Sequence, residues 1–172
     1  MRPRLLALLG VVALGGLASG AAVAWKARQR RAVVVQPMAF NHKRHLAEDM
    51  KCLDCHKGAD KQAQAGAPTV KQCMLCHEEA KGTHPDEPKV REYAARGEAI
   101  PWIQVNRLGH DAYFSHVAHV NFAKMDCAEC HGDMKDQTEP VTRPQITQLD
   151  MDRCMRCHKE KGASNDCLRC HQ

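Results

Sequence analysis

The sequence contains few of the side chains that ordinarily fill an apolar core. Its 172 residues include only three Phe, two Tyr and two Trp. Large aromatic side chains dominate the energetics of most cores, so this shortage argues against an ordinary globular interior. Cysteine is also absent outside one recurring motif, and residues 1–31 contain no acidic residue. Something other than side chains must therefore supply apolar surface to the fold.

All ten cysteines lie in five copies of the motif Cys-x-x-Cys-His, the attachment signature of a c-type haem. Two thiols at this spacing can form thioethers with the vinyl groups of one porphyrin, and the adjoining imidazole then lies under the ring. Structural zinc and disulfides are the alternatives, but zinc does not need a His directly after the second Cys. We therefore expect five covalently attached haem c groups, whose apolar faces replace the missing side chains. The motifs are Cys52-Cys55-His56, Cys73-Cys76-His77, Cys127-Cys130-His131, Cys154-Cys157-His158 and Cys167-Cys170-His171.

Residues 1–31 are predicted to form a transmembrane anchor. Residues 5–25 carry no charge, and as a helix they would be about 31 Å long, close to the roughly 30 Å hydrocarbon core of a bilayer. A cleaved signal peptide is the alternative, because Ala18-Ser19-Gly20 resembles a cleavage site. The apolar run is longer than a usual signal core, however, and it ends in Trp25 and a basic stretch.

The basic charge of the whole chain comes from this anchor region. Residues 1–31 hold six Lys and Arg, whereas residues 32–172 carry 19 Lys and Arg against 20 Asp and Glu. The excess of positive charge is therefore confined to the region that flanks the predicted membrane span, and it indicates no nucleic-acid partner. Because haem c is attached outside the cytoplasmic membrane, we expect a single-pass protein of that membrane whose haem domain faces the periplasm.

A near-duplication predicts two related units. The segment Phe40-Asn41-His42-Lys43-Arg44-His45 recurs as Phe114-Ser115-His116-Val117-Ala118-His119, ten and eleven residues before a haem cysteine when counted from the first His. We expect a haem-dominated, mostly irregular fold with short α-helices and two c7-like multihaem units. Its parts are the anchor 1–31, a two-haem unit 32–84, a linker 85–111 with a short helix, and a three-haem unit 112–172.

The sequence predicts four helix ends. Residues 86–96 predict the linker helix, with Pro88 near its start and Gly97 just past its end. Thr69 and Gln72 form a capping box ahead of Cys73, and Asn165-Asp166 offers a cap ahead of Cys167.

The two Phe-x-His-x-x-His segments resemble those of the class III cytochromes, the small c3 and c7 multihaem proteins. The resemblance implies that His42 and His45 ligate the haems at Cys52 and Cys73, and that His116 and His119 ligate those at Cys127 and Cys154. The motif histidines would bind the other faces: His56, His77, His131, His158 and His171.

The haem at Cys167 needs a sixth ligand from elsewhere. The c7 pattern places a His just before the preceding motif, but this chain has Leu149-Asp150-Met151-Asp152-Arg153 there. Met151 is the predicted substitute, because thioether ligation of haem is established and raises the reduction potential. His110 is the main alternative, followed by His84, another Met or an open position.

Over nearly the whole chain, the anchor included, the sequence is similar to the pentahaem membrane-anchored subunit of alternative complex III. The similar segments are Cys73-Met74-Leu75-Cys76-His77, residues 97–102 leading to Tyr113-Phe114-Ser115-His116, and Leu149-Asp150-Met151. The chain departs from that family at Gly109-His110-Asp111, where a Pro-Asp-aromatic run is expected. The resemblance implies three partners: integral-membrane quinol-oxidising subunits, an iron–sulfur/molybdoenzyme-like subunit and a monohaem cytochrome c.

These features predict an electron-transfer subunit, which is not itself an enzyme, passing electrons to a periplasmic acceptor such as a monohaem cytochrome or terminal oxidase. With every iron six-coordinate, no substrate can bind iron. A multihaem reductase would need a vacant haem position. A stand-alone anchored quinol dehydrogenase shares the layout but lacks the Phe-x-His-x-x-His pairs.

The complete use of cysteine in attachment motifs predicts five covalent haems per chain. Denatured protein should keep a haem stain on a gel, because thioethers survive denaturation. A pyridine haemochrome assay should count five haems per polypeptide. A count of three or fewer would contradict this interpretation.

Overall fold

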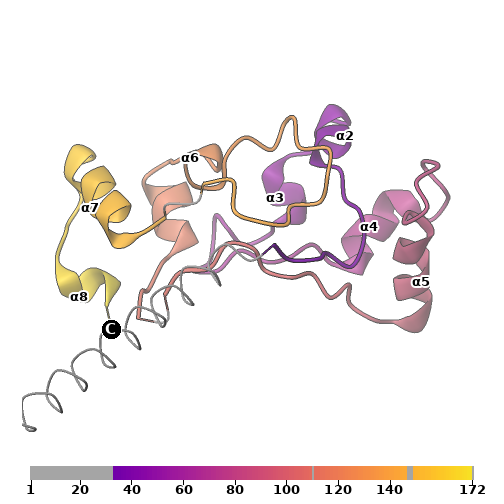
Figure 1. Cartoon of the computed structure of the whole chain (residues 1–172), viewed down its shortest axis with the longest axis horizontal. Coiled ribbons are helices and arrows are strands. Elements are labelled where there is room, and N and C mark those ends of the chain that lie inside the picture. Colours follow the sequence, from indigo (N-terminus) through magenta and orange to yellow (C-terminus); the bar gives the residue numbers. More distant parts are fainter. Residues whose placement is uncertain (1–32, 110, 147–148, 172) are drawn as a thin grey trace, which may run out of the picture. The chain divides into compact units, whose positions relative to one another are not determined.

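The computed structural model describes residues 33–109, 111–146 and 149–171 (Figure 1). The predicted anchor at residues 1–31 lies outside these described residues. Within the described ranges, no helix is long and apolar enough to span a bilayer. The chain from Val34 onward forms one compact unit, and the description below concerns that unit.

This unit consists of short helices joined by irregular segments, with no strand among the residues described. Each attachment motif lies on a helix or at its start, so the two cysteines of a pair are one turn apart and face the same side. The structure therefore confirms the predicted irregular fold with short helices. The helices are α2 (His42–Ala47), α3 (Cys52–Cys55), α4 (Val70–His77), α5 (Pro88–Arg96), the π-helix η1 (Val117–Phe122), α6 (Ala128–His131), α7 (Met151–Glu160) and α8 (Cys167–Cys170).

The predicted helix ends are confirmed. In the capping box of α4, the Gln72 backbone N–H donates to Thr69 Oγ1 and the Thr69 N–H donates to Gln72 Oε1. The linker helix α5 has Pro88 in its first turn and ends at Gly97, whose φ of 66° is left-handed. Asp166 caps α8 by accepting a hydrogen bond from the Leu168 N–H at 3.1 Å.

The two histidine-rich segments adopt the same local geometry. In each, the Phe ring stacks on the second imidazole with centroids 4.3 Å apart and interplanar angles of 22° and 21°. The same ring lies edge-on to the first imidazole, at 4.8 and 4.9 Å. The residues are Phe40, His42 and His45 in the first segment and Phe114, His116 and His119 in the second. The second segment continues into the π-helix η1, whose wider turn suits its one extra residue before the haem cysteine.

The protein core of this unit is small and lies between α4 and α5, which run side by side (Figure 1). Met38, Val90 and Ile100 are buried there, and with Ala59 they are the buried apolar residues of the described chain. By contrast, Leu75 and Leu168, which lie inside attachment motifs, are 78% and 75% exposed on the protein alone. The small core agrees with a fold whose remaining apolar surface comes from a cofactor.

The cap of α4 generates a stability prediction. Thr69→Ala removes the side-chain acceptor for the Gln72 N–H and should lower the free energy of unfolding by about 1 kcal/mol. Denaturant titration followed by circular dichroism measures the loss. Thr69→Ser keeps the hydroxyl and should cost much less. Equal losses in the two variants would mean that the cap does not stabilise α4.

Candidate haem-ligand sites

The ten motif cysteines all lie among the described residues, and none forms a disulfide. Their side chains are exposed or partly buried on the helices that carry them. Across the described chain, no group of three or more His, Cys, Asp or Glu side chains is placed to hold a metal ion. Burial is the main cause that raises the pKa of five of the thiols: Cys55, Cys73, Cys127, Cys130 and Cys154.

Three of the predicted ligand pairs are brought together, with their ring centroids about one iron-bridged distance apart. The ring centroids of His45 and His77 are 6.1 Å apart, those of His116 and His131 are 6.2 Å apart, and those of His119 and His158 are 6.1 Å apart. A metal–imidazole bond is roughly 2.0–2.1 Å long, so two imidazoles on opposite sides of one iron have centroids roughly 6.3 Å apart. The spacing therefore leaves room for one iron within each pair.

The Nδ1 atoms show which ring nitrogen is free to bind iron. In six predicted ligands Nδ1 lies 2.7–3.2 Å from a backbone carbonyl oxygen. A carbonyl only accepts hydrogen bonds, so Nδ1 must carry the hydrogen and Nε2 keeps its lone pair. The pairs are His45 with Asn41, His56 with Gly66, His116 with Ala63, His119 with Ser115, His158 with Ser164, and His171 with Asp111.

Two motif histidines use side chains in place of backbone carbonyls. The His131 Nδ1 lies 3.0 Å from the side-chain amide nitrogen Nδ2 of Asn106, and because an amide nitrogen only donates, Nδ1 is the acceptor in this contact. The His77 Nδ1 lies 2.9 Å from Glu87 Oε1, and the guanidinium of Arg91 also binds this carboxylate. Hydrogen bonds from Arg91 first, and then from His77, lower the pKa of Glu87 to about 2, so the carboxylate is ionised.

His42 is the exception among the predicted ligands. Its Nδ1 is buried and has no hydrogen-bond partner. Burial, followed by the nearby imidazoles of His56 and His45, lowers its pKa to about 4. The ring is therefore neutral at neutral pH, which is the form that can bind a metal.

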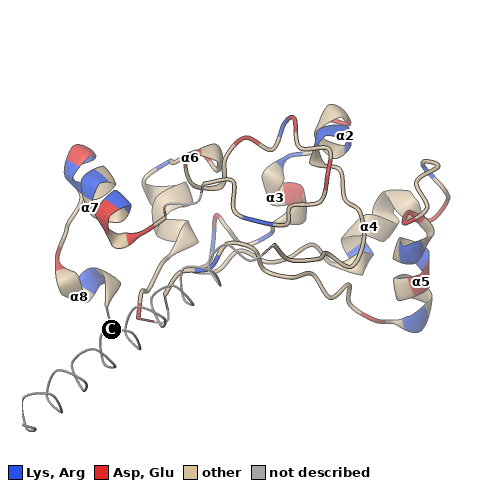
Figure 2. Ribbon diagram, in the orientation of Figure 1, with Lys and Arg blue, Asp and Glu red and all other residues tan. Residues whose placement is uncertain are grey.

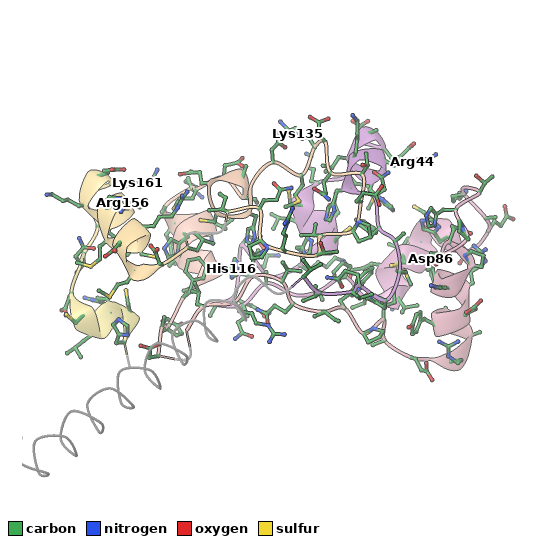
Figure 3. All side chains as sticks on the ribbon, viewed as in Figure 1. Arg44, Asp86, His116, Lys135, Arg156 and Lys161 are labelled. Carbon is green, nitrogen blue, oxygen red and sulfur yellow. The ribbon has the colours of Figure 1, made fainter. Side chains whose placement is uncertain are left out.

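Hydrogen bonds join the first two attachment sites to each other and to the core. Gln72 Nε2 on α4 donates to the backbone oxygens of Asp54 and Cys55 on α3, at 2.8 and 3.1 Å. At the start of the linker helix, Asp86 Oδ2 accepts a 2.7 Å hydrogen bond from the Ala39 N–H, just before the first histidine segment (Figure 3). The sites at Cys52 and Cys73 are therefore neighbours.

The site at Cys52 also adjoins the site at Cys127. The second histidine segment lies against the loop after the first motif, because the backbone N–H groups of His116 and Val117 donate to Ala63 and Gln62 at 2.9 and 3.0 Å. The pKa of Cys127 is raised by burial and then by the neighbouring Cys52 thiol. Figure 3 shows His116 near the middle of the unit, away from Arg156 and Lys161 at α7.

The remaining sites continue in the order of the sequence. Arg153 on α7 donates to the Glu129 backbone oxygen on α6 at 3.3 Å. Asn165, just before α8, donates to the Met155 oxygen on α7 at 3.1 Å. The five attachment sites therefore follow one another in the order Cys73, Cys52, Cys127, Cys154, Cys167, with the first two motifs in reverse of their order in the chain.

The three candidates for the sixth ligand of the last site differ in their surroundings. Met151 begins α7, and 61% of its surface is exposed. His110 lies outside the described residues. The His84 Nδ1 accepts a 3.1 Å hydrogen bond from the Asp86 N–H, so its hydrogen is on Nε2, the reverse of the arrangement at the six predicted ligands that face backbone carbonyls.

Sequence reasoning missed Glu87, Arg91 and Asn106, the side chains that surround the Nδ1 atoms of two motif histidines. Glu87 lies ten positions after His77, and Asn106 lies 25 positions before His131. No motif spacing signals either contact, because both depend on how separate segments pack.

Two family models match separate parts of the chain. Residues 112–172 match cytochrome c7 and related cytochrome c, and residues 44–100 match cytochrome c3. None of the curated proteins compared with the chain matches it. Together with the fold and the ligand geometry, the two matches support a class III multihaem cytochrome. Such proteins carry covalently bound haem c and transfer electrons.

The pairing of His119 with His158 predicts the effect of removing one ligand. His119→Ala should open one iron position opposite His158, so the reduced variant should bind carbon monoxide at one haem per chain. A CO difference spectrum of dithionite-reduced protein measures this, and an unchanged far-UV circular dichroism spectrum shows that the fold is kept. His84→Ala is the matched control and should bind no more CO than the wild type. Equal CO binding by wild type and His119→Ala would contradict the proposed pair.

Proposed function

We propose that the chain is a membrane-anchored pentahaem c-type cytochrome that passes electrons from a quinol-oxidising complex to a periplasmic acceptor. The observation that carries the proposal is the unbroken order of five attachment sites, each joined to the next by hydrogen bonds between its helices and loops. Bound haem c supplies one-electron chemistry at its iron. The protein's task is to hold the groups close together and to set their ligands.

Four sites have two histidines in this proposal. In six of these eight imidazoles, Nδ1 lies against an oxygen acceptor, which fixes the ring orientation and tautomer and leaves Nε2 for the metal. Ligands on both faces leave no open position for a substrate, which favours an electron carrier over a reductase. The pairs are His42 with His56, His45 with His77, His116 with His131, and His119 with His158.

We assign Met151 to the fifth site, together with His171. The His171 Nδ1 is hydrogen-bonded to the Asp111 carbonyl at 2.7 Å, so Asp111 lies on the side of the imidazole that faces away from the iron. A sixth ligand has to approach from the other face. The assignment of Met151 rests on the sequence before Cys154, where a methionine stands in place of the histidine of the c7 pattern.

The membrane location rests on the sequence of residues 1–31, with their uncharged run and basic flank. The proposed partners are integral-membrane quinol-oxidising subunits, an iron–sulfur/molybdoenzyme-like subunit and a monohaem cytochrome c. Purification of the full-length protein from its own membranes tests this arrangement. Copurification of polytopic subunits supports the complex, whereas isolation of an active quinol-oxidising protein without them would favour a stand-alone quinol dehydrogenase.

The assignment of Met151 predicts the highest reduction potential at the Cys167 site, because a thioether stabilises ferric iron less than an imidazole does. Met151→His should move one component of a redox titration to lower potential. The weak red charge-transfer band of His/Met ferric haem should disappear from the spectrum. Met155→His, one turn further along α7, is the matched control and should leave both observations unchanged. A wild type without that band would contradict the assignment.

A further inference from the structure

One of the five motif histidines differs from the others in the charge of its hydrogen-bond partner. His77 contacts the carboxylate of Glu87 at 2.9 Å. The partners of the other four are neutral, three of them backbone carbonyls and one a side-chain amide. The carboxylate of Asp111 is 3.8 Å from the His171 Nδ1 and 82% exposed, so it is beyond hydrogen-bonding distance and screened by water.

The Glu87 carboxylate is held rigidly and away from solvent. Its side chain is only 10% exposed. Both terminal guanidinium nitrogens of Arg91 donate to it, Nη1 to Oε1 and Nη2 to Oε2, each at 2.8 Å. The Lys81 N–H adds a weaker contact at 3.3 Å. This bidentate geometry fixes the carboxylate in one orientation, with Oε1 directed at the imidazole.

An ion pair this little exposed is poor evidence for a role in stability, because the desolvation of its charges offsets much of their attraction. Figure 2 shows that α5 contains both acidic and basic residues, and the pair formed by its N-cap Glu87 and by Arg91 is the one that contacts a predicted iron ligand. A carboxylate that accepts the Nδ1 hydrogen of a metal-binding imidazole increases the basicity of the other nitrogen. A more basic ligand stabilises ferric over ferrous iron.

We propose that Glu87 is a positioning residue that acts through His77 and gives the Cys73 site the lowest reduction potential of the five. The inference rests on the haem ligation proposed above. Arg91 orients the carboxylate. It also reduces the carboxylate's effect on the reduction potential, because its positive charge partly neutralises the acceptor. The Cys73 site stands at one end of the order of sites, opposite the Cys167 site with its proposed thioether. Reduction potentials are therefore lowest at the α4–α5 end and highest at the α7–α8 end.

The test uses two variants of the holoprotein that change the charge in opposite senses. Glu87→Gln keeps the size of the side chain and an oxygen acceptor but loses the negative charge. In a potentiometric titration this variant should raise the reduction potential of the lowest of the five components and leave the other four potentials unchanged. Arg91→Gln removes the cation that partly neutralises the carboxylate, so it should lower the reduction potential of the same component further. Structural damage would not move one component in opposite directions.

Glu98→Gln is the matched control, because Glu98 pairs with Arg96 at 2.8 Å on the surface and contacts no histidine. It should move none of the five components. The double variant Cys73→Ser, Cys76→Ser assigns the component, since it should lose one haem and the lowest component together.

The outcomes separate this inference from the proposed function. Two outcomes would overturn the role of Glu87 while five haems are still present. In one, the lowest reduction potential is unchanged in Glu87→Gln. In the other, the potential that shifts belongs to a component that the double cysteine variant still has. An unchanged haem count in the double cysteine variant would refute attachment at Cys73, and with it the proposed function.

Discussion

An imidazole that binds iron through Nε2 carries its hydrogen on Nδ1, and in seven of the nine predicted histidine ligands an oxygen acceptor lies beside that nitrogen. The six backbone carbonyls that accept these hydrogens belong to Asn41, Ala63, Gly66, Asp111, Ser115 and Ser164, all of which lie outside the helices. Regular secondary structure would use those carbonyls internally. The irregular chain places these acceptors beside the imidazoles, although three of them (Asn41, Ala63 and Ser115) also accept a backbone N–H.

The duplicated histidine segments show which part of this arrangement is repeated. Phe40 and Phe114 fix their two imidazoles with nearly equal distances and angles, although the segments continue into different helices. What surrounds them differs. The first segment lies beside α4 and α5, where the small apolar core and the Glu87–Arg91 pair are found. The same local ligand unit thus meets different electrostatic surroundings, which is how similar ligands can acquire different reduction potentials.

Local chemistry explains which features the sequence alone could predict. The caps at Thr69 and Asp166 and the left-handed Gly97 depend on residues within a few positions of each other, and all three are confirmed. The partners of His77 and His131 could not be predicted, because Glu87 and Asn106 are ordinary polar residues until separate segments bring them together. The sixth ligand of the last haem stays a prediction from the sequence around Met151, and the anchor stays one from residues 1–31.

The sequence by itself determined the attachment chemistry, since a thioether pair with its adjoining imidazole needs only five consecutive residues on one helical turn. It also determined the absence of a large side-chain core. Only the tertiary structure decided the order of the sites, with Cys73 before Cys52, and the surroundings of each imidazole's Nδ1 atom. These depend on contacts between segments distant in the chain, whose pairing is set by packing and backbone hydrogen bonds and carries no local sequence signal.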